Sequence, residues 1–183
     1  MRSEKSPGEA AQISFVAALA VADLAETCLG PGVARLKWPN DLLLHGKKAA
    51  GILVESGALA DQSLWLAVGI GVNLAHAPQD VERPACAFAE HLAAPPSPLA
   101  ALDVLAGAFE RRLTQWSRQG FAPIAEAWTR RAHGMGEPCE ARLPGQTLWG
   151  VAEGLDTDGA LRLRQDDGAI MRITAGDVFF GAH

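Results

Sequence analysis

The stretch KWPNDLLLHGKKAAGILVE, residues 37–55, decides the fold that the sequence predicts. It contains two apolar runs of strand length, residues 42–44 and 52–54, on either side of a short connection that includes Gly46. Two such runs around a short glycine-containing segment are typical of a β-hairpin. The polar residues of the stretch therefore collect at the ends of this predicted hairpin.

Polar side chains make this hairpin the candidate functional site. Lys37, Asn40, Asp41 and Lys48 bring two ammonium groups, an amide and a carboxylate to it, and Gly51 lets a ligand approach the backbone closely. Taken separately, Pro-Asn-Asp is ordinary turn chemistry and Gly-Lys-Lys is an ordinary solvated hairpin tip. Taken together, they predict a site for an anionic ligand.

Length and composition limit the class of protein. With 183 residues, 49% of them hydrophobic, the chain can form a full core, and we expect one domain with a small appendage. The net charge of −5 and the absence of a Lys/Arg-rich run argue against nucleic-acid binding. Three scattered cysteines disfavour a zinc site and suit a cytoplasmic location. The sequence contains neither a signal-peptide pattern nor a run of 18 apolar residues, so neither secretion nor a membrane span is supported.

The segments before and after the hairpin predict a helix and a further strand. Ser6-Pro7-Gly8-Glu9 has the pattern of a capping box, so a helix of about 20 residues with one apolar face should follow it. Residues 64–74 predict a central strand that is buried on both faces. Asn73 stands at the end of this strand, where capping of the next loop is the alternative to a ligand role.

The second half of the sequence changes in character after Gly134. Before it, residues 75–98 predict a long surface connection, and two helices should follow. After it, strand-length segments alternate with turn signals such as Asp158-Gly159 and Asp167-Gly168, which favour hairpins over a calcium loop. We therefore divide the chain into domains 1–134 and 135–183, the second being a small all-β unit.

Three motifs in this order resemble the biotin protein ligases: KWPND at residues 37–41, GKKAAGILVE at 46–55 and GIGVN at 69–73. With the capped helix and the terminal β unit, the resemblance covers essentially the whole chain. It implies an α/β (α+β) fold, with a mixed β-sheet flanked by helices as in the biotin/lipoate protein ligase catalytic domain, which is class II aminoacyl-tRNA synthetase-like. It also implies a small C-terminal SH3-like β-barrel.

The resemblance implies an activity and its partners. The family uses ATP, with Mg²⁺, to activate biotin to biotinyl-5′-AMP, and then transfers biotin to a lysine of a biotin carboxyl carrier protein, the acceptor domain of a biotin-dependent carboxylase. We accordingly expect a cytoplasmic enzyme with no nucleic-acid or membrane partner. A homodimer is compatible with this expectation.

The resemblance also assigns roles to residues. Lys48 matches the lysine that contacts the biotin carboxylate and the α-phosphate, and Asp41 is expected to orient the carrier lysine or accept its proton. The remaining matches are ligand-binding positions: Gly51 and Leu53 for the biotin pocket, Asn40 and Asn73 for the adenylate and the nucleotide phosphates, and Lys37, for which a structural role is the alternative.

One part of the family pattern is not found in this sequence. Family members carry, before the capped helix, further strands and a Gly/Arg-rich loop that closes over the adenylate. We therefore expect an N-terminally truncated member of the family. Without the loop that shields the adenylate from water, this chain alone should not catalyse the reaction efficiently. Two alternatives stay open: a lipoate-type ligase or acyltransferase, and a non-catalytic carrier-binding remnant. The KWPND motif and the terminal β unit favour biotin.

Overall fold

A computed structural model describes residues 1–181 of the chain. Its first sheet has the strand order β1-β5-β4-β3-β2. We expected a mixed sheet, but every pairing between its named strands is antiparallel, and the parallel contacts within residues 1–181 are isolated bridges. The strands are β1 (Arg2–Ser3), β2 (Ala34–Lys37), β3 (Asp41–Leu44), β4 (Lys47–Ala58) and β5 (Leu64–Val72).

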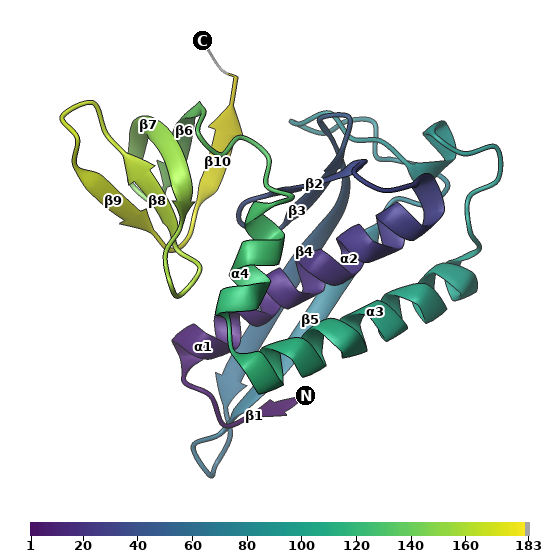
Figure 1. Ribbon diagram of the computed structural model, residues 1–183, viewed down its shortest axis with the longest axis horizontal. Coiled ribbons are helices and arrows are strands. Elements are labelled where there is room, and N and C mark those ends of the chain that lie inside the picture. The colour runs from purple at the N-terminus through teal and green to yellow at the C-terminus, as the bar shows by residue number, and fades with distance from the viewer. Residues whose placement is uncertain (182–183) are drawn as a thin grey trace.

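Helices cover one face of this sheet (Figure 1). They are α1 (Pro7–Ala11), α2 (Ile13–Leu29), α3 (Pro98–Gln119) and α4 (Ala122–Thr129), with a short 3₁₀ helix η1 (Phe88–Glu90) in the connection before α3. The capping box at Ser6 and Glu9 is confirmed. The single helix that we predicted after it is interrupted at Gln12, whose side-chain oxygen accepts a hydrogen bond from the buried Trp116 indole at 3.0 Å.

Helix α2 is buried over most of its surface, where the sequence predicted only one apolar face. The reason is that α2 lies between the sheet and the helices α3 and α4 (Figure 1). The stretch Pro7–Leu29 is also long and apolar enough to cross a membrane by length and composition alone. Its place in the core accounts for that composition, because 67% of the most apolar window is buried inside the protein.

Strand β5 is not buried on both faces, so this prediction was wrong. Trp65, Ala67, Gly69 and Gly71 are exposed or partly exposed in alternation with residues that face α2. The opposite face of the sheet is left open by residues 1–181, because all the helices in this part pack on the α2 side. The open face is therefore available to a ligand.

The second sheet has the strand order β10-β6-β7-β8-β9 and contains only antiparallel pairs (Figure 1). Gly159 and Gly168 have φ angles of 95° and 85°, which confirms the two turn predictions. The Trp38 indole donates a hydrogen bond to the Gly159 carbonyl at 3.1 Å and so ties the first sheet to the second. The strands are β6 (Pro138–Leu143), β7 (Gln146–Leu155), β8 (Leu161–Arg164), β9 (Ile170–Ile173) and β10 (Asp177–Phe180).

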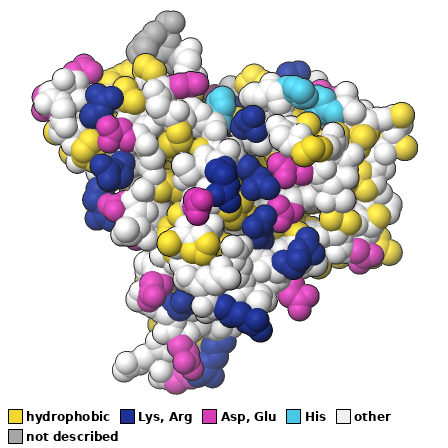
Figure 2. Space-filling view, viewed as in Figure 1, with side chains coloured by type: hydrophobic (Ala, Val, Ile, Leu, Met, Phe, Trp, Pro, Cys, Tyr) yellow, Lys and Arg dark blue, Asp and Glu magenta, His cyan; other side chains and the backbone are white. Residues whose placement is uncertain are grey.

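Charges of both signs share the surface. On the face shown in Figure 2, lysine and arginine side chains are interspersed with aspartate and glutamate side chains. The two signs of charge are therefore mixed on this face.

Candidate functional site

The predicted hairpin is formed by β3 and β4. His45 and Gly46 connect the two strands, and their φ angles of 49° and 78° are those of a two-residue turn whose twist matches the strands. Asp41 pairs with Gly51, but the register shifts between Leu42 and Leu43. The hairpin of the sequence analysis is thus confirmed, with an irregularity that the sequence did not indicate.

The register shift puts Lys48 on the same face as Asp41. Leu42 pairs with Ala50 and Leu43 pairs with Lys48, so Ala49 is an extra residue on β4. Side chains alternate along a strand, and an extra residue reverses the alternation beyond it. Lys48 therefore points to the face that carries Asp41 and Gly51.

Lys48 and Asp41 form the central ion pair of the site. The Lys48 Nζ atom lies 2.5 Å from Asp41 Oδ1, and the carboxylate is 4% exposed while the lysine side chain is 42% exposed. Gly51 leaves room for this contact, because a Cβ atom there would lie only 3.2 Å from both Cε and Nζ of Lys48. The absence of a side chain at position 51 therefore leaves space for the lysine side chain and is not required by the backbone conformation.

Arg83 adds a second cation beside Asp41. Its guanidinium lies 3.6 Å from Asp41 Oδ2 and 3.0 Å from Asp177 Oδ1 on β10. The connection that carries Arg83 is fixed to β4, because the Lys48 amide donates to the Pro84 carbonyl at 2.9 Å and the Cys86 amide donates to the Lys48 carbonyl at 3.0 Å. Arg83 thus joins the hairpin to the second sheet.

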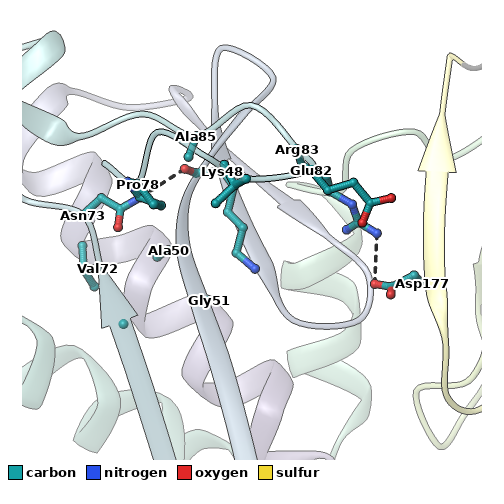
Figure 3. A pocket seen from close by; sticks show the side chains of 12 residues that line it. Lys48, Ala50, Gly51, Val72, Asn73, Pro78, Glu82, Arg83, Ala85 and Asp177 are labelled. Atoms are coloured by element: carbon teal, nitrogen blue, oxygen red, sulfur yellow. Dashed lines mark hydrogen bonds and ion pairs between the residues drawn. The ribbon is translucent and has the colours of Figure 1, made fainter. Parts of the chain in front are cut away.

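Two cavities meet at this group of charges. The larger, of about 660 Å³, extends past Gly51, Gly71 and Asn73, and the smaller, of about 320 Å³, extends past Lys37 and Phe179. Lys48, Glu82 and Arg83 line both cavities and form the ridge between them. In Figure 3 the Lys48 side chain extends from its strand into the space between Asn73 and the Arg83–Asp177 pair.

The two asparagines have structural partners. The Asn73 side-chain amide donates to the Cys86 carbonyl at 3.1 Å and to the Lys48 carbonyl at 3.4 Å, so it closes the following loop, as the alternative interpretation predicted. Asn73 also lines the larger cavity. The Asn40 amide donates to the Ile52 carbonyl at 2.7 Å, and Asn40 lines neither cavity. Their ligand roles stay predictions.

Lys37 is a buried ammonium group without a hydrogen bond within the described part of the chain. Its side chain is 7% exposed, and its Nζ atom lies 5.6 Å from the centroid of the Phe179 ring. Burial, and next the positive charge of Arg83, lower the pKa of Lys37 from its ordinary value to about 8. The structure thus separates Lys37 from Gly51 and Asn73 and places it in the smaller cavity.

Leu53 lies outside both cavities. It follows Gly51 by two residues on the same open face of β4, where it pairs with Gly69, and it is 62% exposed. An exposed leucine beside glycines offers an apolar surface to a ligand on the open face of the sheet. Its assignment to a biotin pocket stays a prediction.

No group of three or more histidine, cysteine, aspartate or glutamate residues within residues 1–181 is arranged to hold a metal ion. Mg²⁺ is commonly bound through one or two carboxylates together with substrate phosphates. Glu82 on the ridge, with Asp177 in the larger cavity and Asp41 in the smaller one, offers carboxylates for binding of this kind, in which a nucleotide supplies the phosphate ligands.

The sequence analysis missed Arg83, Asp177 and Phe179. The Phe179 ring lies between two guanidinium groups, with the Arg83 and Arg142 Cζ atoms 4.2 and 4.0 Å from its centroid. These residues come from a proline-rich connection and from the last strand, so no local pattern joins them to the hairpin. Only the tertiary fold brings them together.

Comparison with protein families identifies two matches. Residues 2–73 match the model of the biotin/lipoate A/B protein ligase family, and residues 134–181 match the biotin protein ligase C-terminal domain. The chain is 46% identical over 185 aligned residues to a biotin--[acetyl-CoA-carboxylase] ligase of Paracoccus denitrificans, covering 94% of the chain and 74% of that protein. It is 32% identical to the bifunctional ligase/repressor BirA of Bacillus subtilis, covering 93% of the chain but 53% of that protein.

Solved structures show the same fold. A biotin protein ligase from Aquifex aeolicus matches with a TM-score of 0.80 at 22% sequence identity, over 94% of the chain and 76% of that protein. The Aquifex aeolicus enzyme in complex with biotin and ATP matches with a TM-score of 0.77 at 24% identity, over 92% of the chain and 70% of that protein. The α/β fold with a C-terminal β domain is therefore confirmed.

Proposed function

Because the chain belongs to the biotin protein ligase family, we propose that it activates biotin with ATP and transfers it to a lysine of a biotin carboxyl carrier protein. One observation carries the proposal beyond family membership. Lys48 lies beside Gly51 on the ridge between the two cavities and is partly open to solvent, and its buried partner Asp41 lines the smaller cavity. This arrangement suits a reaction between anions followed by the deprotonation of an amine.

The first step requires a cation between two anions. A carboxylate oxygen of biotin attacks the α-phosphorus of ATP, the bond from that phosphorus to the bridging oxygen breaks, and its electron pair leaves with pyrophosphate. Lys48 is partly exposed beside the larger cavity, so its ammonium can contact both the biotin carboxylate and the α-phosphate. A compact cation at this position stabilises the charge that develops in the transition state.

The second step requires a base. The ammonium of the carrier lysine must lose a proton before its nitrogen attacks the acyl carbon of biotinyl-5′-AMP and displaces AMP. Asp41 supplies a carboxylate that lines the smaller cavity and is held in place by Lys48 and Arg83. A positioned carboxylate of this kind acts as a general base or orients the amine.

The proposed ligand positions follow the two cavities and the open face of the sheet. Biotin would lie along Gly51 and Leu53, and the adenylate would occupy the larger cavity beside Asn73, with Asn40 holding the hairpin end. Mg²⁺ would enter with the phosphates of ATP. The carrier protein, the cytoplasmic location and a homodimer stay predictions.

Biotin-dependent exchange between ATP and labelled pyrophosphate tests the first step. We expect Lys48→Met to lower the exchange rate by about 10²–10³-fold, because removal of one transition-state donor has effects of this size. Lys47→Met is the matched control, since Lys47 is the exposed neighbour on the same hairpin and should exchange at the unsubstituted rate.

Near-normal exchange by Lys48→Met would show that Lys48 does not take part in the first step. Labelling of a carrier domain with biotin and, separately, with lipoate tests the substrate, because the N-terminal match covers both kinds of ligase. Labelling with lipoate alone would contradict the biotin assignment. Binding of biotin and ATP without either reaction would favour a non-catalytic carrier-binding protein.

A further inference from the structure

We propose that one face of the second sheet carries a binding pocket for a carboxylate group, held by Arg162 and Arg164 of β8. The pocket has a volume of about 440 Å³ and is lined by residues of β7 and β8 together with Gly136. Within residues 1–181 it shares no lining residue with the two cavities of the candidate site. Strand β6 separates β7 and β8 from β10, which contacts Arg83 (Figure 1). The pocket is therefore a separate site, and the inference does not depend on the proposed function.

The pairing of β7 with β8 places three charged side chains on the same face of the sheet. Ala152 on β7 pairs with Leu163 on β8, and both side chains are buried in the core. Side chains alternate along a strand, so the sequence neighbours of a buried residue lie on the opposite face. Glu153, Arg162 and Arg164 therefore lie together on the face that is open to solvent, and all three line the pocket.

Arg162 has a hydrogen-bond donor that no residue of the described chain uses. Its Nε atom is buried and makes no hydrogen bond within residues 1–181. A terminal nitrogen of its guanidinium lies 3.6 Å from Glu153 Oε2, while the other oxygen of that carboxylate accepts a hydrogen bond from Arg164 Nε at 2.7 Å. A buried donor without an acceptor costs free energy, and an oxygen of a ligand would remove this cost.

Arg172 shows what a fully paired arginine looks like on the same face. It lies directly across from Arg162 on the neighbouring strand β9, and directly opposed side chains share a face. Its guanidinium lies 2.5 Å from Asp156 Oδ2 and 2.6 Å from Asp158 Oδ2. Arg172 thus has two carboxylates to itself, whereas Arg162 and Arg164 share one.

Charge and shape select the ligand. Two guanidinium groups against the one carboxylate of Glu153 leave a single positive charge, which a monoanion neutralises and a phosphate dianion would exceed. The planar guanidinium matches a carboxylate with two parallel hydrogen bonds. Val151 and Leu155 add apolar lining, and Gly136 and Gly154 have no side chains to fill the pocket. The ligand class is therefore a carboxylate on a short apolar chain, as in a free aliphatic acid or a glutamate side chain of a partner protein.

Titration with valerate, followed by NMR at the Nε–Hε groups of the two arginines, tests the proposal. We expect both resonances to shift and to saturate, and the neutral isostere valeramide to shift neither. Arg162→Gln should weaken valerate binding, read at Arg164, by about tenfold, because charge-assisted hydrogen bonds are lost. Glu153→Gln should instead bind valerate severalfold more tightly, since it removes the carboxylate that competes with the ligand.

A pair of charge-preserving variants provides the matched control. Arg162→Lys keeps the positive charge but lacks the Nε donor and the planar fork, so it should bind valerate more weakly than the unsubstituted chain. Arg172→Lys makes the same change at the fully paired arginine across the strand pair and should leave the affinity unchanged. Backbone amide spectra of the four variants show whether the second sheet keeps its fold.

Several outcomes would overturn the inference. Unchanged affinity in Arg162→Gln would do so, as would weaker binding in Glu153→Gln, equal losses in Arg162→Lys and Arg172→Lys, or tighter binding of inorganic phosphate than of valerate. A carrier domain added in place of valerate distinguishes the sources of the carboxylate. A shift of the Arg162 resonance would assign the carboxylate to this partner protein, and valerate binding without such a shift would assign the pocket to a free acid.

Discussion

At the scale of single residues, the site is an arrangement of charges that depends on a glycine. Gly51 leaves room for the Lys48 tip beside Asp41, and Arg83 lies near the other oxygen of the same carboxylate. The sequence predicted Lys48, Asp41 and Gly51 as site residues because all three lie within one hairpin motif. It could not predict that Gly51 serves the lysine, since that contact depends on the register shift.

Gly51→Ala tests this dependence. The new Cβ atom would lie 3.2 Å from Lys48 Cε and Nζ, which is tighter than most contacts of this kind, so the lysine tip must shift by a few tenths of an ångström from its position beside Asp41. We expect biotin-dependent pyrophosphate exchange to fall by about tenfold, as small misplacements of a reacting group have effects of this order or larger. The melting temperature should change little, because only a flexible side-chain end is displaced.

Gly69→Ala provides the comparison for Gly51→Ala. Gly69 lies on the same open face of the neighbouring strand, where a Cβ atom would meet Leu53 atoms no closer than 3.7 Å. A smaller loss of exchange is expected from this variant. If both substitutions lowered exchange equally, crowding of the open face and not displacement of Lys48 would be the cause.

Lys37 should reduce stability in the absence of a ligand. Its pKa of about 8 in the folded protein lies below its ordinary value of 10.5, so between these pH values the unfolded chain holds a proton that the folded chain lacks. Stability therefore rises with pH across this window and is lowest, for this group, below pH 8. Lys37→Met should melt at a higher temperature than the unsubstituted chain at pH 7.

The pH dependence of melting checks this prediction. The difference in melting temperature between Lys37→Met and the unsubstituted chain should shrink as the pH rises from 7 towards 10. A constant difference over this range would show that Lys37 is not a desolvated ammonium in the folded protein. Lys47→Met should show no such trend, since Lys47 is exposed.

At the scale of elements, the hairpin and the connection before η1 form the site together. Periodicity, turn residues and the capping box were sufficient to predict β4, β5, α3 and the turns of the second sheet. They could not predict which strand faces would be covered, so the prediction that β5 is buried on both faces was wrong. They also gave no sign that the connection after Asn73 would attach to β4 and carry Arg83, because that attachment uses backbone groups.

The link from the connection to β10 can be measured with a double-mutant cycle. Arg83→Gln and Asp177→Asn should each lower kcat/KM for ATP by about three- to tenfold, because both loosen the cation beside Asp41. The double variant should lose little more than either single variant, since both substitutions remove one contact. Arg130→Gln, which removes an exposed pair with Glu126 within one helical segment, should leave kcat/KM unchanged.

Fully additive effects in this cycle would contradict the link. Arg83 and Asp177 would then act on ATP independently, and the 3.0 Å contact between them would have no functional weight. If the substitutions lowered the melting temperature but left kcat/KM unchanged, the contact would stabilise the fold without serving the site.

At the scale of the whole molecule, the candidate site lies where the first sheet meets the second. Trp38 donates to the Gly159 carbonyl in the turn between β7 and β8, and Arg83 bridges Asp41 to Asp177 on β10, so the KWPND motif is linked to the second sheet directly and through Arg83. The sequence predicted the two units separately, since each has its own local patterns. Their contact depends on residues far apart in the chain, and for that reason it emerged only from the fold.

Ligand-induced stabilisation should therefore reach both sheets. A ligand that binds only the folded chain stabilises it by about 2.7 kcal/mol at a concentration of 100 times its Kd. Biotin and ATP together should raise the melting temperature by more than the sum of their separate effects, because the adenylate that they form joins the open sheet face to the larger cavity. In Lys48→Met the two shifts should become additive, since the adenylate is not formed. Unfolding should remain a single transition in both proteins. If the second sheet melted separately from the first and its melting temperature did not respond to ligands, the contacts of Trp38 and Arg83 would not couple the two sheets.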